Sequence, residues 1–355
     1  MKQSLLLCLG LLWAGFAFIS TLSAQTTAND YISSAKAKYA TGDFNSAIAS
    51  LTKAIELNPN NAEAYNDRGF AKNAKSDFDG AIADYDKAIE LHSNYALAYT
   101  NRGLTKNLKG NHNGAIADWT EAIELDPKFA LPYYNRGTAE YHEGNLDTAM
   151  ADLDKAIELY PQYAFAYGNR GIVKELNGDL NGAIADFEKT IELSPGSAYA
   201  YGLLGNAKQS KGEFEAAIDD YAKSIVLDKA NADYARFYLT LTLRRLQRDD
   251  GPSGLAIEVK GWKDGWTKTI GLYLTRNLSE TDFLAHSKQG DEKIVREHQC
   301  EAFYFVGMTH LLTKETSIAQ KFFKKCLTTN EMDFVEFFLA RAELVRLSDK
   351  QRLSH

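Results

Sequence analysis

The sequence predicts an all-α protein built as a superhelical solenoid of stacked helix–turn–helix repeats, followed by a helical cap. A period of 34 residues first aligns six tyrosines: Tyr31, Tyr65, Tyr99, Tyr133, Tyr167 and Tyr201. Four positions after each tyrosine stands a small residue: Ala35, Gly69, Gly103, Gly137, Gly171 and Gly205. Twelve positions further on stands an alanine: Ala47, Ala81, Ala115, Ala149, Ala183 and Ala217. Small residues at both places let two antiparallel helices approach closely, and stacking supplies the core that one pair lacks.

Each repeat resembles the tetratricopeptide repeat, whose signature is an aromatic, a glycine, an alanine, an aromatic, an alanine and a proline at fixed offsets. The third repeat has the whole pattern, as Tyr99, Gly103, Ala115, Trp119, Ala122 and Pro127. The resemblance implies a right-handed superhelix whose concave face is formed by the first helix of each repeat. We expect six repeats within 25–231, at about 28–61, 62–95, 96–129, 130–163, 164–197 and 198–231.

A targeting segment precedes the repeats. Lys2 is followed by a nearly uninterrupted apolar stretch from Ser4 to Ile19, and small residues up to Ala24 suit a cleavage site. We therefore expect a signal peptide at 1–24, cleavage after Ala24, and an exported product that is periplasmic or secreted. A retained anchor is the alternative, but the apolar stretch of sixteen residues falls short of the roughly 20 that a spanning helix needs. Gln25 stands where a lipoprotein has its modified cysteine, so no lipid anchor is expected.

Composition and motifs argue against an enzyme and against a nucleic-acid partner. The formal charge of −7 comes from 40 basic and 47 acidic residues, without a basic stripe. The seven histidines are scattered, and the sequence has no nucleophile elbow, phosphate-binding loop or His-Glu-x-x-His motif. His298 and Cys300 are too few ligands for a closed zinc site. We expect no catalytic residue, no metal, no cofactor and no small-molecule substrate.

Charged residues recur with the repeat and are expected to be structural. The aspartates are Asp84, Asp118, Asp152, Asp186 and Asp220, and the arginines are Arg68, Arg102, Arg136 and Arg170. Register counting favours pairs between neighbouring repeats, namely Asp84 with Arg102, Asp118 with Arg136 and Asp152 with Arg170. Pairing inside one repeat is the alternative. A lysine column is expected to bury its stems: Lys38, Lys72, Lys106, Lys174 and Lys208.

Partner binding is expected on the concave face, at the second, fifth, ninth and twelfth places of each first helix. These places are apolar and rich in amides, which suits an extended peptide backbone. The candidates are Asn66, Phe70, Asn73, Thr100, Leu104, Asn107, Tyr134, Thr138, Tyr141, Ile172 and Glu175. In the last two repeats the fifth places are Gly168 and Gly202, and Asn206 is a ninth place. The alternative is a solvated inner face without a dedicated ligand.

The region 232–355 is expected to be helical. Tyr234 to Arg248 predicts an apolar helix that covers the last repeat, and Glu331 to Leu347 predicts a final long helix. Between them the repeat pattern returns once, at about 300–333, as Phe303, Gly307, Ala319 and Phe323.

This tail also resembles the C-terminal part of the NlpI type of bacterial lipoprotein over roughly the last 120 residues. The shared features are Leu272, Leu274, Asn277 to Thr281, Phe303, Phe305, Gly307, Phe334 to Glu336, Ala340, Glu343 and Leu344. The resemblance implies a periplasmic adaptor that forms dimers and brings a protease and cell-wall hydrolases together. The missing lipidation cysteine and the more uniform front repeats depart from that type.

Two cysteines remain after processing, and their spacing predicts a disulfide. In an antiparallel helix pair, the place numbers of facing residues sum to about 28, and Cys300 is first while Cys326 is twenty-seventh. An exported protein meets an oxidising compartment. The alternative is that Cys326 merely fills a small-residue column and Cys300 is a free thiol.

The leading functional prediction is a noncatalytic exported scaffold or adaptor that binds proteins or extended peptides. It would link an envelope protease or cell-wall hydrolase to its substrates. The alternative is a self-associating structural or assembly factor of the cell envelope. An unrecognised hydrolase is the third reading.

Overall fold

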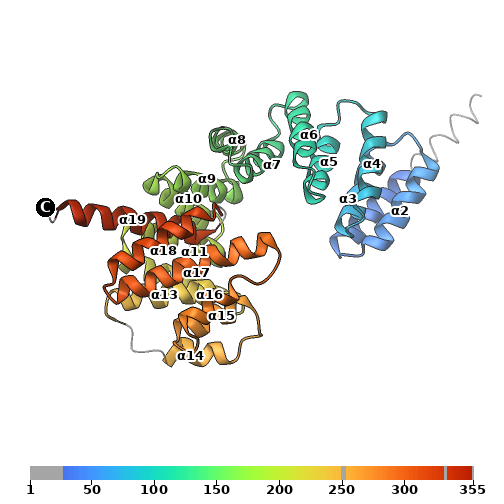
Figure 1. Cartoon of the computed structure of the whole chain (residues 1–355). Helices are drawn as coiled ribbons and strands as arrows, with labels where there is room; N and C mark the ends of the chain where they lie inside the picture. Colours follow the sequence, from blue (N-terminus) through green and yellow to red (C-terminus); the bar gives the residue numbers. More distant parts are fainter. Residues whose placement is uncertain (1–26, 249–252, 332–333, 354–355) are drawn as a thin grey trace, which may run out of the picture. The chain divides into compact units, whose positions relative to one another are not determined.

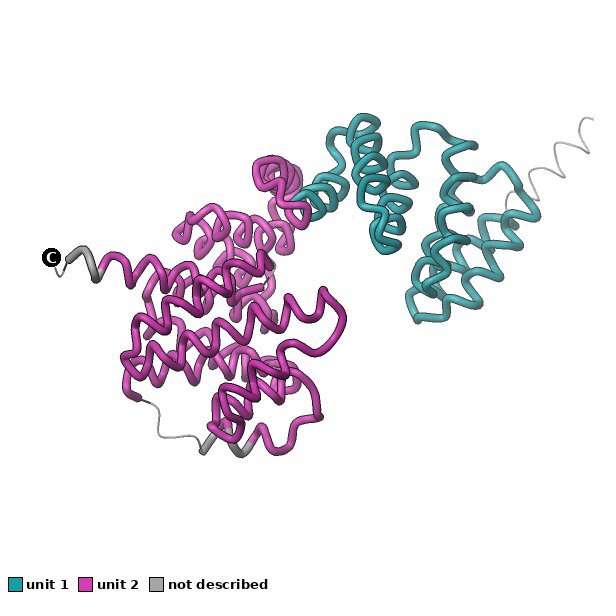
Figure 2. The backbone as a smooth tube through the Cα atoms, viewed as in Figure 1, with its two compact units in different colours: residues 1–140 teal, residues 141–355 magenta. Residues whose placement is uncertain are grey.

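The computed structural model describes residues 27–248, 253–331 and 334–353, and all their regular structure is helical (Figure 1). The predicted signal peptide lies outside the described residues. The chain divides into two compact units, residues 1–140 and 141–355 (Figure 2). In unit 1, residues 27–40 are helical and are followed by α2 (Phe44–Leu57), α3 (Ala62–Ala74), α4 (Phe78–Leu91), α5 (Ala96–Leu108), α6 (His112–Leu125) and most of α7 (Ala130–His142).

Unit 2 continues the helix pairs and adds the C-terminal helices. Its repeats contain α8 (Leu146–Leu159), α9 (Ala164–Leu176), α10 (Leu180–Leu193), α11 (Ala198–Lys211) and α12 (Phe214–Leu227). They are followed by α13 (Asp233–Arg245), α14 (Ser253–Lys260), α15 (Trp266–Leu274), α16 (Glu280–His286), α17 (Glu292–Leu312), α18 (Thr316–Thr328) and α19 (Val335–Leu353). The predicted all-α array of helix–turn–helix repeats with C-terminal helices is confirmed.

Local sequence sets where each second helix begins. Asp77 caps α4 because its carboxylate accepts the backbone N–H of Gly80, and Asp179 caps α10 in the same way through Gly182. The preceding turn needs a left-handed residue, which is Gly178 (φ 84°) before α10. Ser76 adopts the same conformation (φ 62°) before α4, so the turn tolerates a small polar residue.

The small-residue column packs directly on the aromatic ring of the same repeat. A Cβ on Gly69 would lie 2.8 Å from the Tyr85 ring, and one on Gly103 would lie 2.7 Å from Nε1 of Trp119. Equivalent contacts join Gly171 to Phe187, Gly205 to Tyr221 and Gly307 to Phe323. Any side chain at these glycines would push the two helices apart. The last of these contacts shows that α17 and α18 pack as a repeat-like hairpin.

In three repeats the arginine and the aspartate pair within the same repeat, so the register we favoured is wrong. Arg68 donates to both carboxylate oxygens of Asp84, at 2.9 and 2.7 Å. The same arrangement joins Arg102 to Asp118 and Arg170 to Asp186. Asp84 therefore does not pair with Arg102, Asp118 does not pair with Arg136, and Arg170 bonds Asp186 instead of Asp152. The arginine and the aspartate face each other across one helical hairpin, which brings them together without a neighbouring repeat.

Neighbouring repeats are still linked through the outer nitrogen of the arginine. Nη1 of Arg102 lies 2.6 Å from Asp86 in the preceding repeat, and Nη1 of Arg170 lies 2.7 Å from Asp154. The lysine column is structural, as expected. Four of its ammonium groups bond buried aspartates, in the pairs Lys72–Asp84, Lys106–Asp118, Lys174–Asp186 and Lys208–Asp220. The fifth, that of Lys38, donates to the hydroxyl of Ser50 at 2.7 Å.

The C-terminal helices share one hydrophobic core with the sixth repeat. Tyr221 of α12 belongs to the same buried cluster as Phe237 of α13, Phe305 of α17 and Leu339 of α19. The rings of Phe237 and Phe305 lie 5.7 Å apart, edge to face. Helix α13 packs on α12, as expected of a segment that covers the last repeat. The region after residue 231 is thus continuous with the repeats in its packing.

Candidate functional site

The candidate residues of unit 1 are divided between the surface and the interior. Asn66 and Thr100 are buried, so their side chains support packing. Phe70 is exposed, at 38% of its surface. Partly buried positions are Asn73, Leu104, Asn107, Tyr134 and Thr138.

The amides expected to hold a peptide backbone bond other groups of unit 1. Oδ1 of Asn66 accepts from Asn101 (2.9 Å), and Oδ1 of Asn73 accepts from Thr105 (3.0 Å). The spacing along the first helix predicts which face of the helix a residue lies on. It does not predict that the side chains on that face form hydrogen bonds with the next repeat.

A small pocket does lie beside Phe70. Its volume is about 240 Å³, and Lys36, Tyr39, Asp67 and Phe70 are among its lining residues. The Phe70 and Tyr39 rings are 4.9 Å apart. Burial raises the pKa of Asp67, whose Oδ2 is 3.8 Å from Nζ of Lys36. The pocket is small, and its polar lining residues Lys36 and Asp67 pair with each other.

The candidates of unit 2 are mostly covered. Tyr141 and Glu175 are buried, and Ile172 packs against a hydrophobic cluster around Phe187. Oε1 of Glu175 accepts from the hydroxyl of Ser210 at 3.0 Å. Burial raises the pKa of Glu175 to about 7. A residue held in this way belongs to the interior, although its place in the repeat predicts the concave face.

Helix α19 covers Glu175 by binding the ends of two first helices. Arg341 donates to the carbonyls of Leu176 (2.8 Å) and Glu175 (2.6 Å) at the end of α9. Arg346 donates to the carbonyls of Gln209 (3.0 Å) and Ser210 (2.8 Å) at the end of α11. The last carbonyls of a helix lack partners within it and carry partial negative charge, so two guanidinium groups satisfy them well.

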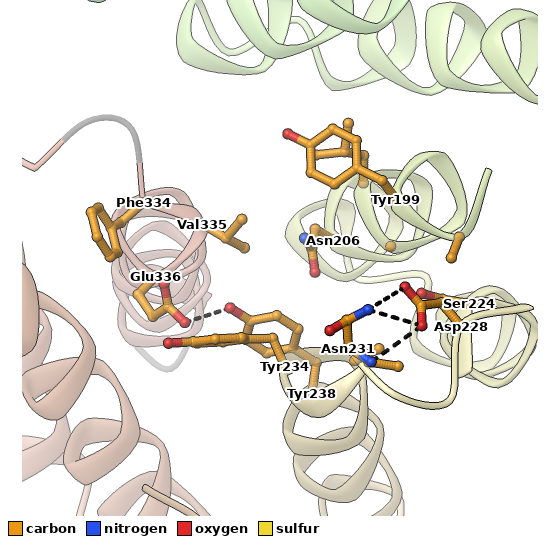
Figure 3. Close-up of a pocket in the computed structure, with 15 residues that line it drawn as sticks. Tyr199, Asn206, Ser224, Asp228, Asn231, Tyr234, Tyr238, Phe334, Val335 and Glu336 are labelled. Carbon is orange, nitrogen blue, oxygen red and sulfur yellow. Dashed lines mark hydrogen bonds between the residues drawn. The ribbon is translucent and has the colours of Figure 1, made fainter. Parts of the chain in front are cut away.

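An open cavity remains next to this contact, and we call it the α11 cavity. It has a volume of about 460 Å³ and lies between α11, α13 and the start of α19 (Figure 3). Its lining includes Tyr199, Gly202, Leu203 and Asn206 from α11, Tyr234, Ala235 and Tyr238 from α13, and Phe334, Val335 and Glu336. Tyr199 lies on one side of the cavity and Tyr234 and Tyr238 on the other (Figure 3). Tyr199 is 70% exposed.

The glycine in this cavity is not required by packing. A Cβ on Gly202 would meet only Oγ of Ser224, at 3.7 Å, which is an ordinary contact. Gly168, at the same place in the fifth repeat, is similar, with Thr190 Oγ1 at 3.7 Å. These positions contrast with Gly171 and Gly205, where an added carbon would clash with a ring. The open floor at Gly202 lets another molecule approach the α11 backbone closely.

One buried carboxyl group, Glu336, lines the α11 cavity, and a second, Glu301, bonds the lining residue Tyr234. Glu336 accepts a hydrogen bond from the hydroxyl of Tyr238, and Glu301 accepts from Tyr234 and from the indole N–H of Trp266. Burial raises the pKa of both glutamates, and the charge of Glu336 raises that of Glu301 further. The residues that bond in these pairs are separated by up to 98 positions in the sequence, so no local pattern could have identified them.

The two cysteines lie together in the hydrophobic core. Their Sγ atoms are 3.4 Å apart across the α17–α18 hairpin, and both residues are buried as free thiols. Cys326 also donates weakly to the carbonyl of Glu336, at 3.6 Å. The disulfide itself stays a prediction.

Two further observations concern the described part of the chain. None of its helices combines the length and the apolar character needed to cross a membrane. Within the same residues, no group of three or more His, Cys, Asp or Glu side chains is placed to hold a metal ion.

Comparison with known families accounts for the repeats. Models described as TPR repeat match residues 35–75, 71–110 and 106–142, and models described as tetratricopeptide repeat match 130–163 and 171–236. Together they cover more than half of the chain. The chain belongs to the tetratricopeptide repeat family. It is therefore a repeat scaffold of a protein-binding kind. The narrower resemblance to NlpI-type lipoproteins concerns residues that lie mostly beyond these matches and has no support from them.

Several solved structures resemble this tetratricopeptide repeat protein. MamA is 33% identical, over 49% of this chain and 94% of that one, with a TM-score of 0.43. YrrB, described as a TPR protein with an unusual peptide-binding site, is 27% identical over 53% and 97%, with a TM-score of 0.44. PilW, described as a widely conserved type IV pilus biogenesis factor, is 21% identical over 60% and 98%, with a TM-score of 0.54, which shows the fold alone. No curated protein matches the chain.

Proposed function

We propose that this protein is a noncatalytic, exported adaptor that binds proteins or extended peptides, with the α11 cavity as its principal docking site. The observation that carries the proposal is that Tyr199, Gly202 and Asn206 line this cavity. These are the second, fifth and ninth places of the sixth repeat, where the repeat pattern predicts the concave face. Export is supported by the apolar segment that precedes Gln25.

The size and character of the cavity suit part of a protein ligand. A volume of about 460 Å³ lies within the range of small-molecule sites, roughly 300–1,000 Å³, and is large enough for one or two side chains. Aromatic residues with exposed rings, such as Tyr199, are common anchors at protein interfaces. Because Gly202 has no side chain, an extended segment of the partner can lie close to the α11 backbone at this point.

The test blocks the cavity without disturbing the core. Gly202→Met places a long side chain in open space, so helicity and thermal stability should be nearly unchanged while capture of partners from cell envelope falls. Val226→Met is the matched control, because Val226 is 65% exposed on α12 and does not line the cavity. Proteins captured by the wild type and the control, but not by Gly202→Met, are then purified and their affinity is measured directly. Equal affinity for wild type and Gly202→Met would reject the cavity as the site.

A second variant tests the inner surface of unit 1. Charge substitutions at Phe70, Leu104 and Tyr134 together remove apolar contact area that is at least partly accessible. If capture falls in this variant and not in Gly202→Met, binding belongs to unit 1.

The same capture experiment separates the two functional classes. An adaptor of the NlpI kind should retain an envelope protease or a cell-wall hydrolase. A self-associating assembly factor should retain mainly further copies of itself. Export is tested by N-terminal sequencing of the protein from the envelope fraction, where we expect Gln25 as the first residue.

A further inference from the structure

The α11 cavity combines aromatic walls with acidic charge. Four rings line it, from Tyr199, Tyr234, Tyr238 and Phe334. Its charged lining residues are Asp228 and Glu336, and no Lys, Arg or His is among the residues that line it. The electrostatic character of the site is therefore negative, and its walls present ring surfaces that attract cations.

Glu336 has no basic partner in the described part of the protein. Its side chain is 2% exposed, and Tyr238 donates to one carboxylate oxygen. The ionisable groups that act on it or feel its charge come from α12, α13, α17 and α18. They are Tyr221, Tyr234, Tyr238, Glu301, Tyr304 and Cys326. Each of these is neutral or acidic at neutral pH, so the carboxylate is buried without a compensating cation, which is unfavourable.

We propose that the α11 cavity accepts a lysine side chain of the partner protein, with the ammonium group paired to Glu336 and the methylene stem against the aromatic walls. The proposal rests on the proposed function, because it names the chemistry that the same docking site selects. A lysine supplies the positive charge that Glu336 lacks and an apolar stem that matches the tyrosine and phenylalanine surfaces. An acidic side chain would meet both Glu336 and Asp228 and is excluded by repulsion.

The geometry favours lysine over arginine. Arginine binds carboxylates best as a planar fork that uses both oxygens. In Glu336 the hydroxyl of Tyr238 already bonds one oxygen. A single ammonium group with rotatable donors needs only the other oxygen and can turn its remaining hydrogens toward the ring faces around it or toward Oδ1 of Asn206. That oxygen already accepts from the hydroxyl of Tyr221 at 2.9 Å, and its second lone pair can accept from the ammonium group (Figure 3).

Binding of lysine should depend on pH in a defined direction. Burial raises the pKa of Glu336 to about 7. The ammonium group pairs with the ionised carboxylate, so below that pH binding must also release a proton. Affinity for a lysine ligand should therefore rise as the pH increases from about 6 to about 8.

The experiment compares two probes that differ only in the ammonium group. Nα-acetyl-lysine methylamide and Nα-acetyl-norleucine methylamide are titrated into the full chain, and binding is followed by NMR chemical-shift changes. We expect the lysine probe to bind about tenfold more tightly or better at pH 8, the scale of a charge-assisted hydrogen bond. Glu336→Gln keeps an acceptor for Tyr238 and should abolish the difference between the probes. Asp264→Asn, on a side chain that is 98% exposed, removes the same charge elsewhere and should leave the difference intact.

Each outcome distinguishes this proposal from the docking site itself. Equal affinity for the two probes, or an undiminished preference for lysine in Glu336→Gln, overturns the lysine assignment. Failure of both probes to bind the wild type overturns it as well. If Gly202→Met nevertheless lowers partner capture in any of these cases, the docking function stands and only its selectivity is wrong. A lysine preference that is retained in Glu336→Gln but lost in Asp264→Asn would place the cation outside the cavity.

Discussion

Among single residues, the buried aspartates show what each cationic partner contributes. Asp118 receives two bonds from Arg102 and one from Lys106, at 2.8 Å. In the sixth repeat a leucine replaces the arginine, and Asp220 retains Lys208 alone, at 2.7 Å. Burial raises the pKa of Asp220 there. The arginine thus completes the solvation of a carboxylate that water reaches poorly.

Arg102→Leu should reproduce the sixth-repeat arrangement in unit 1 at a measurable cost. The variant leaves Asp118 buried with one cation and also removes the bridge to Asp86. We expect the free energy of unfolding to fall by about 2 kcal/mol, the scale of hydrogen bonds to charged groups. Chemical denaturation followed by circular dichroism measures this. Lys87→Ala, which removes an exposed pair with Glu90, should cost no more than about 0.5 kcal/mol. Equal effects of the two variants would mean that the buried pair adds nothing.

Two glycines of first helices, Gly103 in α5 and Gly202 in α11, should respond to replacement by alanine with opposite changes in stability. A Cβ at Gly103 would lie 2.7 Å from Nε1 of Trp119 and 3.1 Å from the carbonyl of Ala115. The indole cannot easily move, because it donates to the carbonyl of Thr100. Gly103→Ala should therefore destabilise the protein by about 1–3 kcal/mol. Gly202→Ala has room and should stabilise α11 by up to about 1 kcal/mol. Thermal unfolding tests the pair, and two shifts of the same sign would contradict the contrast.

For single residues, the repeat columns predicted which side chains are buried better than they predicted which side chains bond each other. A column copied in several repeats identifies packing positions, and Trp119 and Ala115 lie where the period puts them. The pairing of Arg68 with Asp84 corresponds to the alternative within one repeat, which was not favoured because register counting is uncertain by a helical turn. Asn66 lies on the expected side of its helix but bonds Asn101 of the next repeat. Helical spacing alone does not distinguish an inner surface from an interface between repeats.

At the level of helices, the α17–α18 hairpin brings the two cysteines to the same end. The separation of 3.4 Å between their Sγ atoms means that a bond needs only a small change of side-chain torsions. The Cys326 thiol has a raised pKa, because of its hydrogen bond with Cys300 and its burial. Thiolate attack is therefore slow in the folded protein, and pairing should occur during folding in an oxidising compartment.

We expect protein isolated from the envelope to contain the Cys300–Cys326 disulfide. A loop of 25 intervening residues gives a stabilisation on the order of 3 kcal/mol from restriction of the unfolded chain. Mass analysis after alkylation under denaturing conditions, with and without prior reduction, decides the matter. Two alkylated thiols in the unreduced sample would refute the bond. If the bond is present, the double variant Cys300→Ser with Cys326→Ala should have about the same free energy of unfolding as the reduced wild type.

Helix α19 shows where reasoning from one element fails. A long final helix was expected, and α19 extends from Val335 to Leu353. Its buried residues include both Leu339 and Glu343, and the Glu343 carboxylate bonds Arg245 of α13. Partners of this kind lie 98 positions apart. The helix was predictable from its own residues, but its position over Glu175 depends on contacts that no periodic pattern encodes.

Across the whole molecule, the parts whose sequence pattern repeats are the parts whose structure could be predicted. In the repeats each packing position recurs several times, so the pattern can be recognised in spite of single departures such as Leu204. The packing positions of the C-terminal helices mostly occur only once, so no period identifies them. The α11 cavity is lined by residues of these helices and of the sixth repeat. Glu301, Glu336 and Glu175 are all in this second unit, and burial raises the pKa of each. Unit 2 therefore carries several carboxyl groups that are more easily ionised in the unfolded chain.

This concentration predicts that the protein loses stability as the pH rises through the weakly acidic range. The pKa of Glu175 is about 7 in the folded protein, against an ordinary value of 4.5. Between these values the folded state binds more protons than the unfolded state, so the free energy of unfolding falls with pH and levels off above about 7. One such group can lower the free energy of unfolding by at most about 3 kcal/mol.

Glu175→Gln keeps an acceptor for Ser210 but cannot ionise, so its loss of stability between pH 5 and 8 should be smaller than that of the wild type. Denaturation midpoints at several pH values measure both slopes, with Glu292→Gln, on a side chain that is 92% exposed, as the control. Parallel curves for wild type and Glu175→Gln would show that Glu175 is already ionised in the folded protein, stabilised by the neighbouring Arg341.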